Sequence, residues 1–170
     1  QASGDIGIEF RDASWDDLLQ AVMMGTWSTD VLKAGTTRRS FTIERFFSDV
    51  TRYRRAVGCE FNSFSLECPA TGIVTGTFSV LGMDDTGSGT AIAGSSYTAD
   101  PNENVMDSPS GSITVGGSAV TCISAIKLTL ENGIENLPVV GETTRIRGAA
   151  GRSIVTGELT AYYQDDTLLD

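Results

Sequence analysis

Short runs that alternate hydrophobic and polar residues recur along most of this chain. Such alternation is typical of strands that turn one face to a core and the other to water or a partner. The runs that predict strands are residues 5–11, 40–47, 59–66, 73–81, 113–115, 119–130 and 152–163. The pattern therefore predicts a mainly β fold, an antiparallel β-sandwich or barrel.

One segment predicts a helix instead, over residues 14–24. We expect Ser14 to cap its N-terminus together with Asp17, and Gly25 to follow its last turn. An apolar stripe along this segment favours packing of the helix on the sheet, with a partner-binding groove as the alternative. The apolar residues at helical spacing are Trp15, Leu18, Leu19, Val22 and Met23.

Two segments fit neither pattern. Residues 48–56 fit a helical turn or a bent strand equally well. Residues 84–110 form the longest irregular stretch, rich in Gly, Ser and Thr, with acidic residues and no basic one. A loop of this length inside one domain is usually functional or unstructured. We expect a long loop or hairpin extension there, with a weak hairpin over 90–98.

Composition narrows the classes of function. The 170 residues, enough for one domain with a core, carry a net charge of −10. This charge disfavours a grip on nucleic acid, since phosphate binding needs a basic surface. The absence of histidine removes Ser-His-Asp and Cys-His catalysis. We expect Cys59, Cys68 and Cys122 to be small, buried and unpaired hydrophobic residues. No apolar run approaches the ~20 residues of a membrane span.

Two motif-like segments lack the residues that their chemistry needs. Residues 89–96 have the glycine spacing of a phosphate-binding loop, but Ser95 stands where lysine is required. Residues 100–111 begin like a calcium loop, but Val105 and Gly111 replace the required glycine and glutamate. We therefore predict no cofactor and no metal.

Basic residues are concentrated in one stretch. Six of the chain's twelve lie between Arg38 and Arg55. Arginine pairs bidentately with carboxylates and is enriched at interfaces, so we expect Arg52, Arg54 and Arg55 to pair with acids across a contact between copies. The alternative is a solvated basic face. The acidic candidates are Asp84, Asp85, Asp100, Glu103 and Asp107.

Four segments together resemble the phage tail tube protein family. They are DIGIEFRDASWDDLLQAVMMGTW, SFTIERFFSDVTRYRRAVGCEFNSFSLECP, TGIVTGTFSVLGMD and, near the end, LTLENGIENLPVVGETTRIRGAAGRSIVTGELTAYYQDDTLL. The similarity follows the order of the family's pattern over most of the chain and is weakest over 84–117.

The resemblance implies a structural virion protein without enzymatic activity. It would form hexameric rings, assembled in the host bacterial cytoplasm and stacked into a hollow tube. A tape-measure protein would fill the tube, tail terminator and tip proteins would close it, and DNA would pass through without specific binding. We expect Glu60, Glu67 and Glu158 to face the lumen, and residues 84–110 to make the ring-to-ring contact.

Two other classes stay open at this point. A β-sandwich binding or adhesin module of a tail tip or cell surface would need an exposed aromatic platform, for which Trp27, Tyr97, Tyr162 and Tyr163 are scattered candidates. An enzyme would need a nucleophile or metal setting that the sequence does not offer. Because the chain begins at Gln1 beside a predicted strand, we also expect a natural N-terminal segment to precede it.

Overall fold

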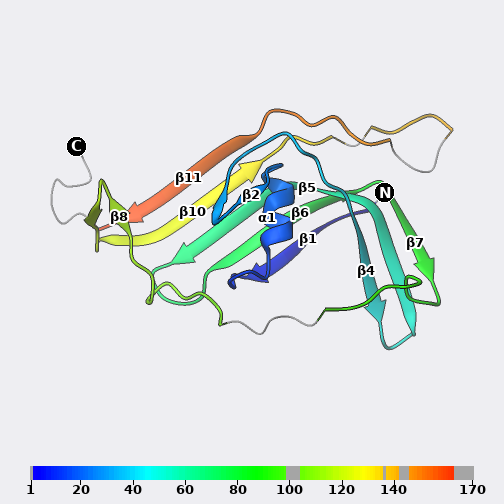
Figure 1. Ribbon diagram of the computed structural model, residues 1–170, viewed down its shortest axis with the longest axis horizontal. Helices are drawn as coiled ribbons and strands as arrows, with labels where there is room; N and C mark the ends of the chain where they lie inside the picture. The colour runs from blue at the N-terminus through cyan, green and yellow to red at the C-terminus, as the bar shows by residue number, and fades with distance from the viewer. Residues whose placement is uncertain (1, 99–103, 136, 142–145, 163–170) are drawn as a thin grey trace.

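A single antiparallel sheet dominates the computed structural model, which describes residues 2–98, 104–135, 137–141 and 146–162 (Figure 1). The predicted antiparallel β fold with one helix is confirmed. The described strands do not close into a barrel, so β1 and β11 are free edges of the sheet. In spatial order the strands are β1 (Ala2–Glu9), β6 (Thr75–Gly82), β5 (Arg52–Pro69), β10 (Ile123–Glu131) and β11 (Ile154–Ala161).

Strand β5 is long enough to belong to two sheets. The second half of this 18-residue strand pairs with β6 and β10. The first half pairs with β4 (Phe41–Phe47) and β7 (Asp84–Ser88). We call β4, β7 and residues 52–57 of β5 the arm, which projects from the sheet at the lower right of Figure 1.

A glycine marks the bend between the arm and the main sheet. Gly58 has a φ of +62°, a conformation that side chains disfavour. A Cβ atom there would also lie 2.6 Å from the sulfur of Met83, so the position has no room for a side chain.

The arm corrects three details of the sequence analysis. Residues 48–51 form a turn and Arg52 already begins β5, so the ambiguous segment is a turn followed by a strand. The stretch 84–110 opens with a strand, β7, and its residues 90–98 form no hairpin. The hairpin extension comes from residues 41–57 instead, because β5 supplies ladder partners on both sides of its first half.

Helix α1 (Asp16–Val22) lies across the sheet and is shorter than predicted. The Ser14 hydroxyl donates to the carbonyl of Asp12 and does not cap the helix. Trp15 is the N-cap residue, and its indole N–H donates to the Glu9 carbonyl at 2.9 Å, which ties the helix start to β1. At the other end Met24, with a φ of +50°, takes the left-handed position predicted for Gly25.

Two short hairpins complete the described structure. Strands β2 (Trp27–Ser28) and β3 (Val31–Leu32) pair in the connection after α1. A turn at Gly116–Gly117 joins β8 (Thr114–Val115) to β9 (Ser118–Ala119).

The core lies between α1 and the centre of the sheet. Val22 and Phe78 are almost completely buried, and the Phe78 ring meets Phe61 at 5.6 Å and Phe64 at 4.6 Å between centroids. The three cysteines are free thiols, as predicted, but only Cys59 and Cys122 are buried, and Cys68 is half-buried. Burial raises the pKa of the Cys59 thiol, which keeps it neutral.

A buried amide joins the helix end to the sheet. The Asn132 side chain donates to the carbonyls of Val22 (2.8 Å) and Phe61 (3.3 Å) and accepts from the Ser153 hydroxyl (2.7 Å). It satisfies a carbonyl of the last turn of α1, which has no partner within the helix. Asn132 is 1% exposed, so water cannot replace it.

We predict that Asn132→Ala lowers the free energy of unfolding by about 2–3 kcal/mol, because it leaves buried hydrogen-bonding groups without partners. Urea denaturation measures the loss. The exposed Asn104→Ala is the matched control and should change stability by less than about 0.5 kcal/mol. Equal effects of the two substitutions would show that Asn132 does not hold the helix to the sheet.

Candidate functional site

The face of the main sheet opposite α1 is mostly polar, although it includes the exposed Ile154 of β11. The register aligns Glu9, Thr75, Glu67, Lys127 and Glu158 as one row across all five strands. Side chains two positions further along each strand share this face. The next row contains Gly7, Thr77, Ser65, Thr129 and Thr156.

The charges on this polar face are mostly negative. The Lys127 ammonium lies 3.0 Å from the Glu67 carboxylate, and both side chains are about half exposed. The hydrogen bond to Glu67 raises the pKa of Lys127, and the nearby charge of Glu158 adds to the effect. Among the main-sheet strands, Lys127 is the one cation on this face. The carboxylates on the same face are those of Asp5, Glu9, Glu67, Glu131 and Glu158.

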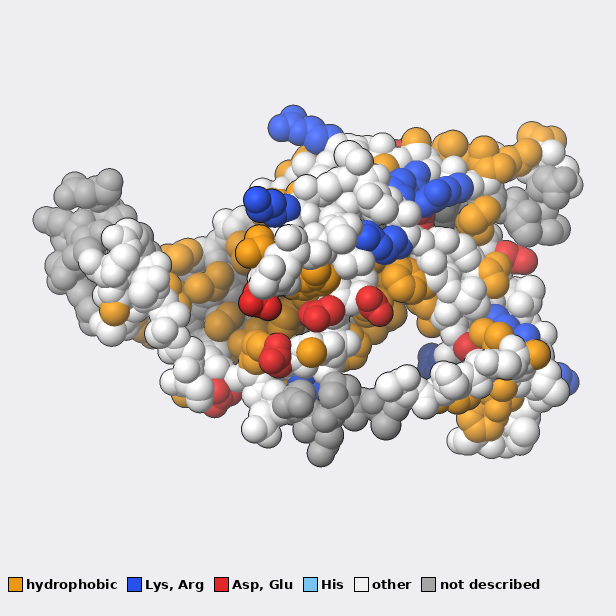
Figure 2. All heavy atoms as spheres, viewed as in Figure 1, with side chains coloured by type: hydrophobic (Ala, Val, Ile, Leu, Met, Phe, Trp, Pro, Cys, Tyr) orange, Lys and Arg blue, Asp and Glu red, His pale blue; other side chains and the backbone are white. Residues whose placement is uncertain are grey.

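The helix side of the sheet is only partly covered. Leu128, Val155 and Leu159 lie on this side of β10 and β11 with 43%, 65% and 52% of their surface exposed. Figure 2 shows hydrophobic side chains open to solvent on this face, to the left of a group of acidic side chains. We call Leu128, Val155 and Leu159 the apolar strip. Apolar side chains this exposed beside a free strand edge are typical of a surface that another chain covers.

The three predicted lumen residues lie in two different settings. Glu67 and Glu158 are exposed on the polar face, on either side of Lys127. Glu60 is buried, and its side chain is 7% exposed. It accepts hydrogen bonds from the Arg147 guanidinium at 2.6 and 2.9 Å and from Arg38. Glu60 is therefore no free carboxylate, and the expectation that it faces a lumen does not fit its burial.

The ion pairs of Glu60 with Arg38 and Arg147 also hold together two loops that are far apart in the sequence. Arg38 donates to the Gly148 carbonyl at 2.7 Å as well as to Glu60, so one side chain contacts both β5 and the segment before β11. Arg147 reaches the same carboxylate from that segment. Sequence analysis missed both arginines, because their separation from Glu60 by 22 and 87 residues leaves no local pattern.

Most of the predicted interface arginines have partners within the chain. Arg54 binds Asp85 bidentately, which lowers the pKa of the Asp85 carboxyl and raises that of the guanidinium. Arg55 binds Glu44 at 2.6 Å and holds the pKa of Glu44 below its ordinary value. Arg52 is exposed and forms no ion pair with any described residue.

The described acidic candidates lie in two places, in β7 and in the segment around Asp107. The Asp84 carboxylate is half-buried and accepts from the Asp85 backbone N–H at 2.8 Å. Asp107 is exposed in the segment that bridges to Ile73. Asp100 and Glu103 lie outside the described residues.

The aromatic residues predicted as candidates for a binding platform do not gather in the described part of the chain. The Trp27 indole donates to the Asp16 carbonyl at 3.2 Å, and the Tyr97 hydroxyl donates to Glu44 at 2.9 Å. Tyr162 is 71% exposed at the far end of β11, and Tyr163 lies outside the described residues. None of the described helices is long and apolar enough to cross a membrane.

We predict that Glu60→Gln lowers the free energy of unfolding by about 3 kcal/mol, because it leaves two arginines facing a neutral group in a buried site. Thermal or urea unfolding measures the loss. Glu67→Gln removes a carboxylate from an exposed pair and should cost less than about 1 kcal/mol. A small effect at both positions would contradict the structural role of Glu60.

Comparison with known proteins identifies the family. No curated protein matches this chain. A family model described as phage tail tube protein matches residues 1–170. The match agrees with the antiparallel sheet and its polar face, and it favours a tail tube subunit over an adhesin module. The chain therefore belongs to the phage tail tube protein family, whose members are structural components of the virion tail that assemble into a tube.

Proposed function

We propose that six copies of this chain form a ring, that the rings stack into a hollow tail tube, and that DNA passes through the tube during ejection. The observation that carries this proposal is the polar, mostly acidic face of the main sheet. In this assembly the polar face lines the lumen. A tape-measure protein fills the lumen before ejection, and tail terminator and tip proteins bind its ends. Assembly takes place in the host bacterial cytoplasm.

The chemistry of the polar face suits a conduit. DNA carries a dense row of phosphates, and basic walls would hold it by releasing its counterions. Carboxylates such as Glu67 and Glu158 repel phosphate, and the neighbouring row of Thr and Ser hydroxyls is neutral. Lys127 lies between two carboxylates, so its charge is largely balanced. A lumen with this lining lets DNA slide without binding it.

The two free edges of the sheet provide a way to close the ring. The sheet has five strands, each antiparallel to its neighbours, so the two edge strands β1 and β11 run in the same direction. Copies related by rotation would therefore join β11 of one to β1 of the next as a parallel pair. Such a head-to-tail contact closes into a ring and leaves no unpaired edge. The neighbouring copy would also cover the apolar strip beside β11.

Residues 84–110 remain our proposal for the ring-to-ring contact. Of the charged candidates, Arg52 and Asp107 are exposed and available to another copy. Arg54 and Arg55 already hold acids of their own chain, so their role would be to stiffen the arm that carries Arg52.

Lysines in the apolar strip should block the lateral contact. We expect Val155→Lys with Leu159→Lys to leave a folded monomer, because buried charges at the joint are costly. Sedimentation velocity measures the loss of rings, and circular dichroism checks the fold. Thr156→Lys with Thr160→Lys adds the same charges to the opposite face of β11 and should still assemble. Normal assembly of the apolar-strip variant would rule out this edge as the joint.

Charge reversal on the polar face should turn the lumen into a DNA-binding channel. We expect tubes of Glu67→Lys with Glu158→Lys to retain short duplex DNA, protected from nuclease, with an affinity that falls steeply as salt rises. Asp16→Lys with Asp17→Lys places the same charges on α1, outside the lumen, and should give no protection. Equal protection in both variants, or in neither, would contradict the assignment of the lumen.

A further inference from the structure

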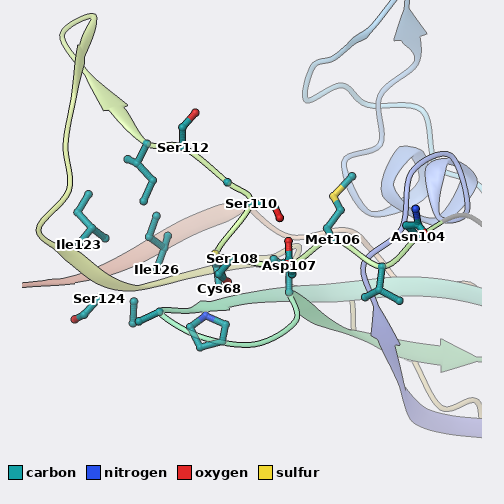
Figure 3. A pocket seen from close by; sticks show the side chains of 17 residues that line it. Cys68, Asn104, Met106, Asp107, Ser108, Ser110, Ser112, Ile123, Ser124 and Ile126 are labelled. Carbon is teal, nitrogen blue, oxygen red and sulfur yellow. Dashed lines mark hydrogen bonds between the residues drawn. The ribbon is translucent and has the colours of Figure 1, made fainter.

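A cavity opens at the end of the molecule farthest from the arm. Its volume is about 630 Å³, and it lies between β10, the end of β5 and residues 104–113, which we call the strap. Figure 3 shows Ile123 and Ile126 rising from β10 toward the part of the strap that carries Ser112. The lining is mostly apolar, and Asp107 is its one charged residue among those described.

The strap is held in place by backbone hydrogen bonds to the segment that follows β1 and to the segment that precedes β6. Met106 donates to the Phe10 carbonyl at 2.8 Å and accepts from Val74 at 2.9 Å. Ser108 donates through its backbone N–H to Gly72 at 3.0 Å, and its hydroxyl lies 3.3 Å from the Cys68 thiol. These bonds mean that the cavity is built into the described structure.

The tip of the arm has the opposite character, since it exposes apolar groups on a projection. Val50, in the turn between β4 and β5, is 62% exposed, and Phe46 is 50% exposed. The Phe46 ring stacks on Tyr53 with centroids 4.6 Å apart, which stiffens the tip. Arg45, Val50 and Arg52 line the same groove of the arm, together with the Arg54–Asp85 ion pair.

We propose that the arm tip of one copy docks in the strap cavity of the next copy along the tube, with Val50 inserted among the apolar lining residues. The arm and the strap that lines the cavity lie at opposite ends of the long axis, along the direction of the sheet strands (Figure 1). The lateral edges β1 and β11 are occupied within a ring, so contacts at the two ends join one ring to the next. This inference rests on the proposed tube and names the partner surfaces of its ring-to-ring contact.

Charge favours a second copy as the occupant of the cavity. The arm tip brings Arg45 and Arg52 toward a cavity whose one charged lining residue is the carboxylate of Asp107. A small apolar molecule would fit a cavity of this size, but it would leave Val50 and Phe46 exposed on the arm. Docking of the arm tip in the cavity covers the apolar lining and the exposed Val50 and Phe46 at the same time.

The native thiol of Cys68, in the cavity lining, allows a direct test. A disulfide requires Cα atoms within about 7 Å, so a bond between copies reports docking. Assembled Val50→Cys protein, treated with a mild oxidant, should form covalent dimers and higher multimers on non-reducing gels. These should be absent when Cys68→Ser is added. The control Val140→Cys places a thiol at a residue that is 101% exposed elsewhere and should form far fewer multimers.

Assembly of a charged variant gives a second readout. Val50→Asp should form rings but no long tubes in electron micrographs, with the fold intact by circular dichroism. Tubes of normal length from Val50→Asp, or crosslinking that survives Cys68→Ser, would overturn the docking inference while the proposed function stands. If the unaltered chain forms neither rings nor tubes, the proposed function itself fails, and the docking inference fails with it.

Discussion

The backbone hydrogen bonds of β5 hold this protein together. This strand is the partner of β6 and β10 in the main sheet and of β4 and β7 in the arm. Its side chains Cys59 and Phe61 lie in the core beneath α1, and Glu60 receives the two arginines that fasten the loops. The arm continues the same strand, and Gly58 marks the bend between the arm and the main sheet.

The two faces of the sheet have different tasks. One face is apolar, and α1 covers its centre while β10 and β11 leave part of it exposed. The other face carries hydroxyls and carboxylates in rows that cross every strand. A sheet with one wet face is stable only when the other is covered, so an exposed apolar strip beside a free edge calls for a neighbour. The fold thus favours self-assembly, and in our proposal the polar face lines the lumen.

Most of the main sheet could be predicted from the sequence, because the alternation of hydrophobic and polar residues within a strand is a local signal. Alternation marked 59–66 and 73–81 correctly, and the helical stripe found α1. Strand β7 was missed because DDTGS has poor strand propensity, and its pairing with β5 overrides that preference. The helix start was misplaced because Trp15 is tied to Glu9 by a tertiary contact.

The candidate site was harder to predict for a related reason. The burial of Glu60 depends on Arg38 and Arg147, which lie far away in the sequence. The polar face becomes visible only when the register aligns five separate strands, which no single run reveals. Glu67 and Glu158 are on that face, but the Lys127 between them was not singled out, since its role exists only across strands.

The orientation of the sheet in an assembled particle tests the central claim most directly. Cryo-electron microscopy of the purified protein, at a resolution that separates the sheet from α1, would show which face lines the hole. We expect stacked rings with the Glu67–Lys127–Glu158 row facing the lumen and α1 on the outside. A lumen lined by α1, or compact monomers at every concentration and salt, would contradict the account.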